Sequence, residues 1–307
     1  MIIKLQQIEG AATGRLRGKI AVVAAHDDNV LASVKEVQDK GYADPILIGD
    51  KEKIFSIADE KGIDVSHMDI IKETDDIQSA RIAVNLVNGG GADVLMKGHI
   101  LTADLMRVVL DKEKGLRTNR VISHVGIFEI DNYPKLLFVT DAGVNISPDL
   151  KQKADIIQNA VYVANRLGIE KPKVAVLSAV EVVNPSMQST VDAAALSKMA
   201  QRGQITNCLV DGPLAMDNAI NLDAALHKHI ESEVAGDADI LVAPNIEAGN
   251  ILVKSLVFLY KARSCSILTG ARVPLVVTSR AEDSTSKYYS ILMALAMREI
   301  YTGGEKS

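Results

Sequence analysis

The sequence has no tryptophan, and aromatic residues make up only 4% of its 307 residues. Its cores must therefore rest on Val, Ile, Leu, Ala and Met, which favours buried parallel strands covered by helices. Only two cysteines occur, Cys208 and Cys265, and each lies inside an apolar run. Two cysteines exclude a disulfide framework, so we expect buried, unreactive thiols in a reducing compartment.

An excess of positive charge is also missing, because the net charge is −5 and the pI is near 5.7. Without a Lys/Arg-rich run the chain lacks the basic surface that nucleic-acid binding requires, although a local basic patch would suit a small anionic ligand. The N-terminus lacks a signal-peptide pattern, and no apolar stretch reaches the roughly 20 residues of a membrane span. We expect a cytoplasmic protein that binds neither nucleic acid nor membrane.

Several common site motifs are absent. No GxGxxG follows a strand, and neither GxxxxGK[ST] nor GxSxG occurs. The glycine run at 88–94 follows a helix and precedes a strand, which indicates a helix C-cap and not a phosphate cradle. His227 and His229 would lie about 200° apart on a helix, so they form no metal-binding pair. We expect no metal site.

Short β-branched runs alternate with longer amphipathic stretches along the whole chain, which is typical of βαβ units and mostly parallel sheets. We expect strands at 19–25, 45–49, 93–98, 121–130, 135–143, 173–179, 207–214, 239–245, 264–270 and 274–280. We expect helices at 28–40, 51–61, 76–88, 101–111, 149–167, 187–202, 217–231, 246–260 and 285–302.

Two consecutive strands within 119–141 have no helix between them and are joined by the polar turn DNYP, so they predict a hairpin. We place the first domain crossing beside it, near residue 120. The closing segment is expected to return to the first domain, because chain termini often lie close together. The sequence thus predicts two α/β domains with mostly parallel sheets, 1–120 plus 268–307 and 121–267, with an active-site cleft between them.

Polar residues gather where five of the expected strands end, at 96–107, 139–149, 210–219, 243–250 and 277–287. In an α/β protein these positions share one edge of the sheet, where ligands bind. The candidates are Lys97, His99, Arg107, Asp141, Asn145, Asp211, Asn245, Asn250, Ser279 and Arg280.

Structural roles compete with the functional interpretation at most of these positions. Thr102 and Asp104 could cap the helix that follows them, and Asn245 looks like a helix start. The stretch 211–213, Asp-Gly-Pro, is a turn signal by composition. Asn250 lies one turn inside its helix, where caps do not occur, so its polarity needs another explanation.

In this order and spacing, KGHILTADLMR, TDAGVNISPD, DGPLAMDNA, PNIEAGN and PLVVTSRAEDS resemble the phosphate acetyl/butyryltransferase family. DGPLAMDNA and TSRA are most similar to its butyryltransferase branch, and the resemblance covers roughly residues 15–300. It implies a homo-oligomer without metal or bound cofactor. It also implies a reaction in which acyl-CoA and phosphate, both small-molecule substrates, give acyl phosphate and free coenzyme A.

The resemblance also assigns roles to single residues. Ser279 and Arg280 match a Ser-Arg pair at the reacting thioester, Arg107 matches an arginine that binds anionic substrate, and Asn250 matches a cleft-lining position. His99, Asn145, Asp211 and Asn245 are further substrate-binding candidates on their strand-end positions alone.

The family pattern and this sequence differ in the position of the acidic residue that would take the proton of the coenzyme A thiol. Acetyl-transferring relatives have an aspartate seven positions after the serine, and Ser286 stands there in this chain. The butyryl branch has an acid three positions after the serine, which is Glu282 here, with Asp283 beside it. We favour Asp283 for its shorter side chain, although it is equally placed to cap the closing helix.

The chemistry suits these residues, because Arg280 can direct two N–H groups at a phosphate or carbonyl oxygen. Direct attack in a ternary complex is favoured over a covalent acyl-serine, since no histidine lies near Ser279 in sequence.

The expected function is phosphate acyltransferase with butyryl preferred, and acetyl transfer is the nearest alternative. An NAD(P)-dependent decarboxylating dehydrogenase and a non-catalytic binding module are more distant ones. The first lacks an aspartate cluster for a divalent metal, and the intact Ser279-Arg280 pair argues against the second.

Overall fold

A computed structural model describes residues 2–12, 17–279 and 282–298 of the chain. The chain divides into two compact units. The first unit comprises Ala12–Arg117 and Arg272–Ser307, and the second comprises Met1–Ala11 and Thr118–Ala271. The expected crossings at 120 and 268 lie within a few residues of these divisions. Residues 1–11, which the sequence assigned to the first domain, group with the second unit, where the Leu5 N–H donates to the Glu129 carboxylate (2.9 Å).

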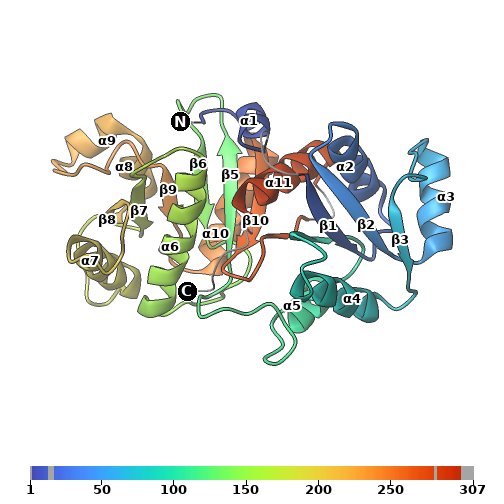
Figure 1. Cartoon of the computed structure of the whole chain (residues 1–307). Coiled ribbons are helices and arrows are strands. Elements are labelled where there is room, and N and C mark those ends of the chain that lie inside the picture. The colour runs from blue at the N-terminus through green and yellow to red at the C-terminus, as the bar shows by residue number, and fades with distance from the viewer. Residues whose placement is uncertain (1, 13–16, 280–281, 299–307) are drawn as a thin grey trace. The chain divides into compact units, whose positions relative to one another are not determined.

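The first unit is built on a parallel sheet in the order β3-β2-β1-β4-β11. Figure 1 shows α2 with α11 on one face of this sheet and α4 with α5 on the other. Its described elements are β1 (Gly18–Val23), α2 (Asp28–Asp39), β2 (Ala43–Gly49), α3 (Lys51–Lys61), β3 (Asp69–Lys72), α4 (Asp76–Asn88), β4 (Val94–Lys97), α5 (Thr102–Val109), β11 (Leu275–Val276) and α11 (Ser284–Met297).

Local signals in the sequence set the helix ends of the first unit. Helices α2, α3, α4 and α11 each begin at an aspartate cap, namely Asp27, Asp50, Asp75 and Asp283. The glycine run at 88–94 ends α4, where Gly90 has φ +72° and the Gly91 N–H donates to the Leu86 carbonyl (2.7 Å). The predicted helix C-cap is confirmed.

The second unit has a mixed sheet in the order β10-β5-β6-β9-β7-β8. The β10–β5 and β5–β6 pairs are antiparallel, and the other pairs are parallel, so the predicted hairpin and the predicted α/β fold class are confirmed. Its described elements are η1 (Leu5–Gln7), α1 (Ile8–Ala12), β5 (Ser123–Glu129), β6 (Leu137–Thr140), α6 (Leu150–Arg166), β7 (Lys173–Leu177), α7 (Gln188–Gln201), β8 (Leu209–Leu214), α8 (Met216–Ile220), α9 (Leu222–His227), β9 (Ile240–Val242), α10 (Ile246–Lys254), η2 (Ser255–Leu259) and β10 (Arg263–Thr269).

The single helix expected at 217–231 is wrong, because the chain forms two short helices there. Asn221 adopts an extended conformation between α8 and α9, and its side chain caps α9 by accepting the Ala224 N–H. The stretch 211–213 lies within β8 and is not the turn between elements that its composition suggested. Asp211 pairs with Ala175 of β7, and the register then shifts before Leu214 pairs with Leu177.

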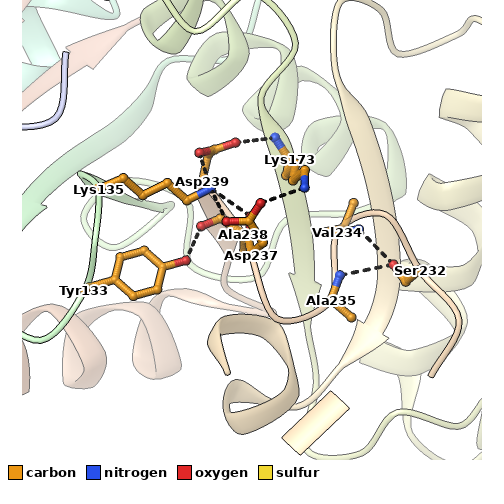
Figure 2. Close-up of polar contacts among 9 residues, drawn as sticks. All are labelled: Tyr133, Lys135, Lys173, Ser232, Val234, Ala235, Asp237, Ala238 and Asp239. Carbon is orange, nitrogen blue, oxygen red and sulfur yellow. Dashed lines mark hydrogen bonds and ion pairs between the residues drawn. The ribbon is translucent and has the colours of Figure 1, made fainter. Parts of the chain in front are cut away.

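An ion-pair network ties together the amino ends of β6, β7 and β9 in the second unit (Figure 2). Lys135 Nζ contacts the carboxylates of Asp239 (2.6 Å) and Asp237 (2.9 Å), and Lys173 Nζ contacts Asp237 (2.6 Å). Asp239 is buried and also accepts the Lys173 backbone N–H at 2.7 Å. The network lies at the strand starts, whereas ligands of parallel sheets bind at strand ends, so its role is to align three strands.

Candidate active site

The carboxyl ends of β1, β4 and β11 meet at one edge of the sheet in the first unit. The register pairs Val23 of β1 with Lys97 of β4, and Met96 of β4 with Val276 of β11. The residues that follow these strands therefore lie side by side, where open α/β sheets place their ligand sites.

Gly98 allows the turn after β4 to lie directly against the end of β1. Its N–H donates to the Val23 carbonyl, and the His99 N–H donates to the Ala24 carbonyl, both at 2.8 Å. A Cβ at this position would lie 2.3 Å from the Ala24 oxygen and 2.5 Å from the Val23 oxygen. Only glycine fits without displacing the backbone.

A cavity of about 390 Å³ opens at this edge, lined by Lys97, Ile100, Leu101, Thr102, Thr278 and Ser279. Lys97 is only 5% exposed, and its Nζ donates to the Gly98 carbonyl (3.1 Å). The N-cap position of α5 is Leu101, which supplies no side-chain cap. Thr102 and Asp104 thus do not take the capping role that the sequence allowed them. A cation, hydroxyl groups and an uncapped helix N-terminus together suit an anion.

Two hydrogen bonds join Ser279 to Glu282. The Glu282 N–H donates to the Ser279 carbonyl (3.1 Å), and the Ser279 N–H donates to Glu282 Oε1 (2.8 Å). The structure thus brings two of the predicted catalytic residues together beside the cavity. Arg280, another of the four, lies outside the described residues.

Asp283 is the N-cap of α11, and its Oδ1 accepts the Ser286 N–H at 2.8 Å. The capping role that the sequence allowed for it is confirmed. Its carboxylate is thereby held at the first turn of the helix, whereas the Glu282 carboxylate is held at Ser279.

Lys287 lies in the first turns of α11 and is only 2% exposed. Its Nζ donates to the carbonyls of Ser279 (3.0 Å) and Glu282 (2.8 Å). Burial lowers the pKa of Lys287, and the nearby carboxylates of Glu282, Asp27, Asp283 and Asp28 oppose that shift.

His99 is exposed after β4, and its ring lies 4.9 Å from that of His26, which follows β1. Burial lowers the pKa of His26, with a smaller opposing effect from Asp76. Arg107 lies on α5 and pairs with Asp104 at 3.0 Å, while 71% of its side chain remains exposed. The i, i+3 ion pair that sequence spacing permits is therefore formed, yet most of the guanidinium stays accessible.

Three of the candidates in the second unit, Asp141, Asn145 and Asn250, lie in or contact the segment that follows β6. The side chain of Asn145 donates to Asp141 Oδ2 (2.6 Å) and to the Ile122 carbonyl (2.9 Å). Asn250 donates to the Ala142 carbonyl (3.2 Å) from inside α10. Asn245 caps α10 by accepting the Ala248 N–H (2.9 Å), so its predicted helix-start role is confirmed.

Asp211 does not join this group. It lies within β8, and β9 and β7 separate β8 from β6 in the sheet, a distance of about 14 Å at ordinary strand spacing. Its Oδ1 accepts the Gly212 N–H of its own strand (2.8 Å).

The sequence assigned no role to two buried lysines of the first unit. Lys97 was a strand-end candidate without a role, and Lys287 was not singled out. The signal for Lys287 was a cation four residues after the helix cap, in a helix that continues YYSILMALAM.

Among the described residues, no group of three or more His, Cys, Asp or Glu side chains is arranged to hold a metal ion. No helix in this part of the chain is long and apolar enough to cross a membrane.

The chain is similar to known phosphate acyltransferases over most of its length. A family described as "Phosphate acetyl/butaryl transferase" matches residues 72–295. The phosphate butyryltransferase of Clostridium acetobutylicum is 49% identical over 276 residues, 90% of this chain and 92% of that protein. The phosphate acetyltransferase of Thermotoga maritima is 47% identical over 290 residues, 94% of this chain and 98% of that protein.

The structural similarity agrees with these relatives. The crystal structure of a branched-chain phosphotransacylase from Enterococcus faecalis V583 superposes with a TM-score of 0.79 at 31% identity, covering 91% of this chain and 98% of that one. The chain belongs to the phosphate acetyl/butyryl transferase family and is therefore an acyltransferase. The family resemblance of its five motifs is confirmed.

Proposed function

We propose that this acyltransferase moves a short acyl group, butyryl in preference to acetyl, reversibly between coenzyme A and inorganic phosphate. The observation that carries the proposal is the cavity at the strand ends of the first unit, which joins Ser279 to buried Lys97 and to the uncapped start of α5. Family membership supports acyl-CoA and phosphate as the substrates.

Inorganic phosphate suits this cavity by charge and by hydrogen bonding. The buried side chain of Lys97 supplies a positive charge, and Thr102, Thr278 and Ser279 supply hydroxyl donors. The first N–H groups of an α-helix favour an anion, because they have no partner within the helix. We place phosphate here, with Arg280 directed at the same charge as the family resemblance implies.

In the proposed reaction, an oxygen of hydrogen phosphate attacks the carbonyl carbon of the thioester while both substrates are bound. The C–O bond forms, the C–S bond breaks, and the phosphate proton passes to the departing thiolate, so the products are acyl phosphate and free coenzyme A. Negative charge develops on the carbonyl oxygen, and preorganised donors aimed at that charge lower the barrier. Ser279 and Arg280 have this role in the proposal.

Of the two adjacent carboxylates, the contacts favour Glu282 as the proton carrier over the sequence-based choice, Asp283. Glu282 Oε1 is fixed by the Ser279 N–H, whereas Asp283 caps α11. In the reverse direction a base matters, because a thiol with a pKa near 8.5 is only a few per cent ionised at pH 7.

The remaining substrate-binding candidates stay predictions, and their contacts differ in what they favour. Arg107 and His99 are exposed, which favours contact with an anionic part of the coenzyme A ester. Asn145, Asn245 and Asn250 already serve local hydrogen bonds, and Asp211 lies apart from them, which favours structural roles.

The experiment that tests the proposal follows thiol release from butyryl-CoA with a thiol-reactive dye, before and after phosphate is added. The assay is run in EDTA and without nicotinamide, because the proposed reaction uses neither a metal nor a redox cofactor. Phosphate-dependent release is expected, and release independent of phosphate would contradict the proposal. Cytoplasmic location and homo-oligomeric assembly remain predictions, the latter measurable by sedimentation.

A further inference from the structure

Lys287 is a buried cation in a helix that is otherwise largely apolar. Its neighbours Tyr288, Ile291 and Leu292 on α11 are at most 2% exposed, as Lys287 is. Burying an ammonium group is unfavourable unless hydrogen bonds and opposite charges compensate for the lost water. Its location in α11 therefore requires compensating contacts nearby.

The Lys287 ammonium binds two backbone carbonyls beside the cavity. It donates to the carbonyl of Ser279 at 3.0 Å and to that of Glu282 at 2.8 Å. The same two residues are also joined to each other, by the Glu282 N–H to the Ser279 carbonyl and by the Ser279 N–H to Glu282 Oε1. Ser279 and Glu282 are thus bonded to each other, and one side chain of α11 bonds both of them.

Four carboxylates act electrostatically on this ammonium and oppose the lowering of its pKa. Asp27 and Asp28 lie at the start of α2, and Glu282 and Asp283 lie at the start of α11. These carboxylates compensate in part for the burial of the cation, which keeps it suited to hold two carbonyl groups.

We infer that Lys287 is a positioning residue of the acyltransferase, holding the backbone of Ser279 and Glu282 so that Ser279 stays at the cavity and Glu282 stays beside Ser279. It acts through backbone carbonyls, and this inference rests on the proposed function of that cavity. A displacement of about 1 Å in a reacting group can lower a rate by about 10²-fold. Loss of Lys287 should therefore reduce kcat, whereas substrate binding by Lys97 and α5 is retained.

The first test compares Lys287→Met with the parent enzyme in the butyryl-CoA assay. We expect kcat to fall at least about tenfold, with KM for phosphate and for butyryl-CoA within about twofold. Lys287→Arg keeps the charge and several donors, so it should recover part of the loss. The matched control is Tyr288→Phe, which alters the adjacent buried residue of the same helix at its contact with Lys40 and should leave kcat unchanged.

The second test does not depend on activity. Amide hydrogen exchange at Ser279 and Glu282 should be protected in the parent, faster in Lys287→Met and unchanged in Tyr288→Phe. If Lys287→Met does not fold, the same two amides and kcat are measured in Lys287→Arg, where both should change in the same direction.

Parental kcat together with parental exchange in either Lys287 variant would overturn the inference. A parent protein without phosphate-dependent thiol release would instead overturn the proposed function. In that case the exchange data still decide whether Lys287 holds Ser279 and Glu282 in place.

Discussion

Glu282 and Asp283 are adjacent in sequence but make different hydrogen bonds. One carboxylate accepts from Ser279, and the other caps α11. We predict that Glu282→Gln lowers kcat for acyl transfer to coenzyme A by at least about tenfold, because a proton-transfer group contributes roughly 10²–10⁴ in rate. Steady-state kinetics with butyryl phosphate and coenzyme A measure the effect.

Asp283→Asn is the matched variant, because asparagine caps a helix about as well as aspartate and cannot accept a proton as a base. We expect parental values of both Tm and kcat. Loss of kcat in Asp283→Asn, with full activity in Glu282→Gln, would return the base to the residue that the sequence favoured.

Arg107 forms an ion pair with Asp104, but its side chain is mostly exposed. An exposed pair of this spacing contributes only about 0.2–0.5 kcal/mol to stability, so Arg107→Ala should leave Tm within about a degree of the parent. As an anion-binding residue it should raise KM for the coenzyme A ester, while kcat is retained. Asp104→Asn serves as the control, since it removes the pair and keeps the cation. Unchanged KM in Arg107→Ala would show that the arginine is a surface residue only.

At the level of single residues, the sequence predicted what depends on nearby residues. The caps at Asp283 and Asn245 were expected because a side-chain oxygen three positions before a backbone N–H is a local arrangement. The burial of Lys97 and Lys287 was not expected, since burial depends on elements far away in the sequence. Lysine is rarely buried, so residue type gave no reason to expect either side chain in the interior.

Gly98 determines how closely the turn after β4 approaches β1. A methyl group there would lie 2.3 Å from the Ala24 oxygen, so Gly98→Ala must displace one of the two turns. We predict a loss of roughly 1–3 kcal/mol in the free energy of unfolding, as for other overpacked sites. The Ser279 cavity should also be distorted, because Lys97 and Ile100 flank this glycine. Urea denaturation and kcat measure the two effects.

Gly10 provides the control for this substitution. It lies in α1 with no atom within 4 Å of an added Cβ, and alanine is favoured over glycine in helices by about 1 kcal/mol. Gly10→Ala should therefore be neutral or stabilising. Equal effects of the two substitutions would show that the close approach at Gly98 is relieved without strain.

Most elements lie within two or three residues of their predicted positions, because apolar periodicity and capping residues agree along the chain. The exceptions have physical reasons. β3 was not predicted because it is a short edge strand with two exposed and two half-buried residues, which leaves no apolar pattern. The break between α8 and α9 occurs at Asn221, which takes an extended conformation inside a stretch of helix-forming residues.

For the whole chain, alternation of strands and helices was enough to predict two α/β units, since it follows from how parallel sheets are connected. The place of residues 1–11 was not predictable in the same way. Their grouping with the second unit depends on contacts such as Leu5 with Glu129, which are distant in sequence. Chemical identity came from motif order over the whole length, since most of the strand-end residues alone had a structural explanation.

Acyl-chain preference is a property of the enzyme as a whole that the cavity walls should determine. Ile100 and Leu101 provide its apolar side, and one methylene group in such a pocket changes discrimination by about 1–3 kcal/mol. We predict that the parent uses butyryl-CoA at least about tenfold better than acetyl-CoA in kcat/KM.

Leu101→Phe should narrow the cavity and reduce kcat/KM for butyryl-CoA more than for acetyl-CoA. Leu101 is 60% exposed, so little change in Tm is expected. Leu110→Phe, at the other end of α5 and away from the cavity lining, is the control. An unchanged ratio in Leu101→Phe would place the acyl chain elsewhere in the enzyme.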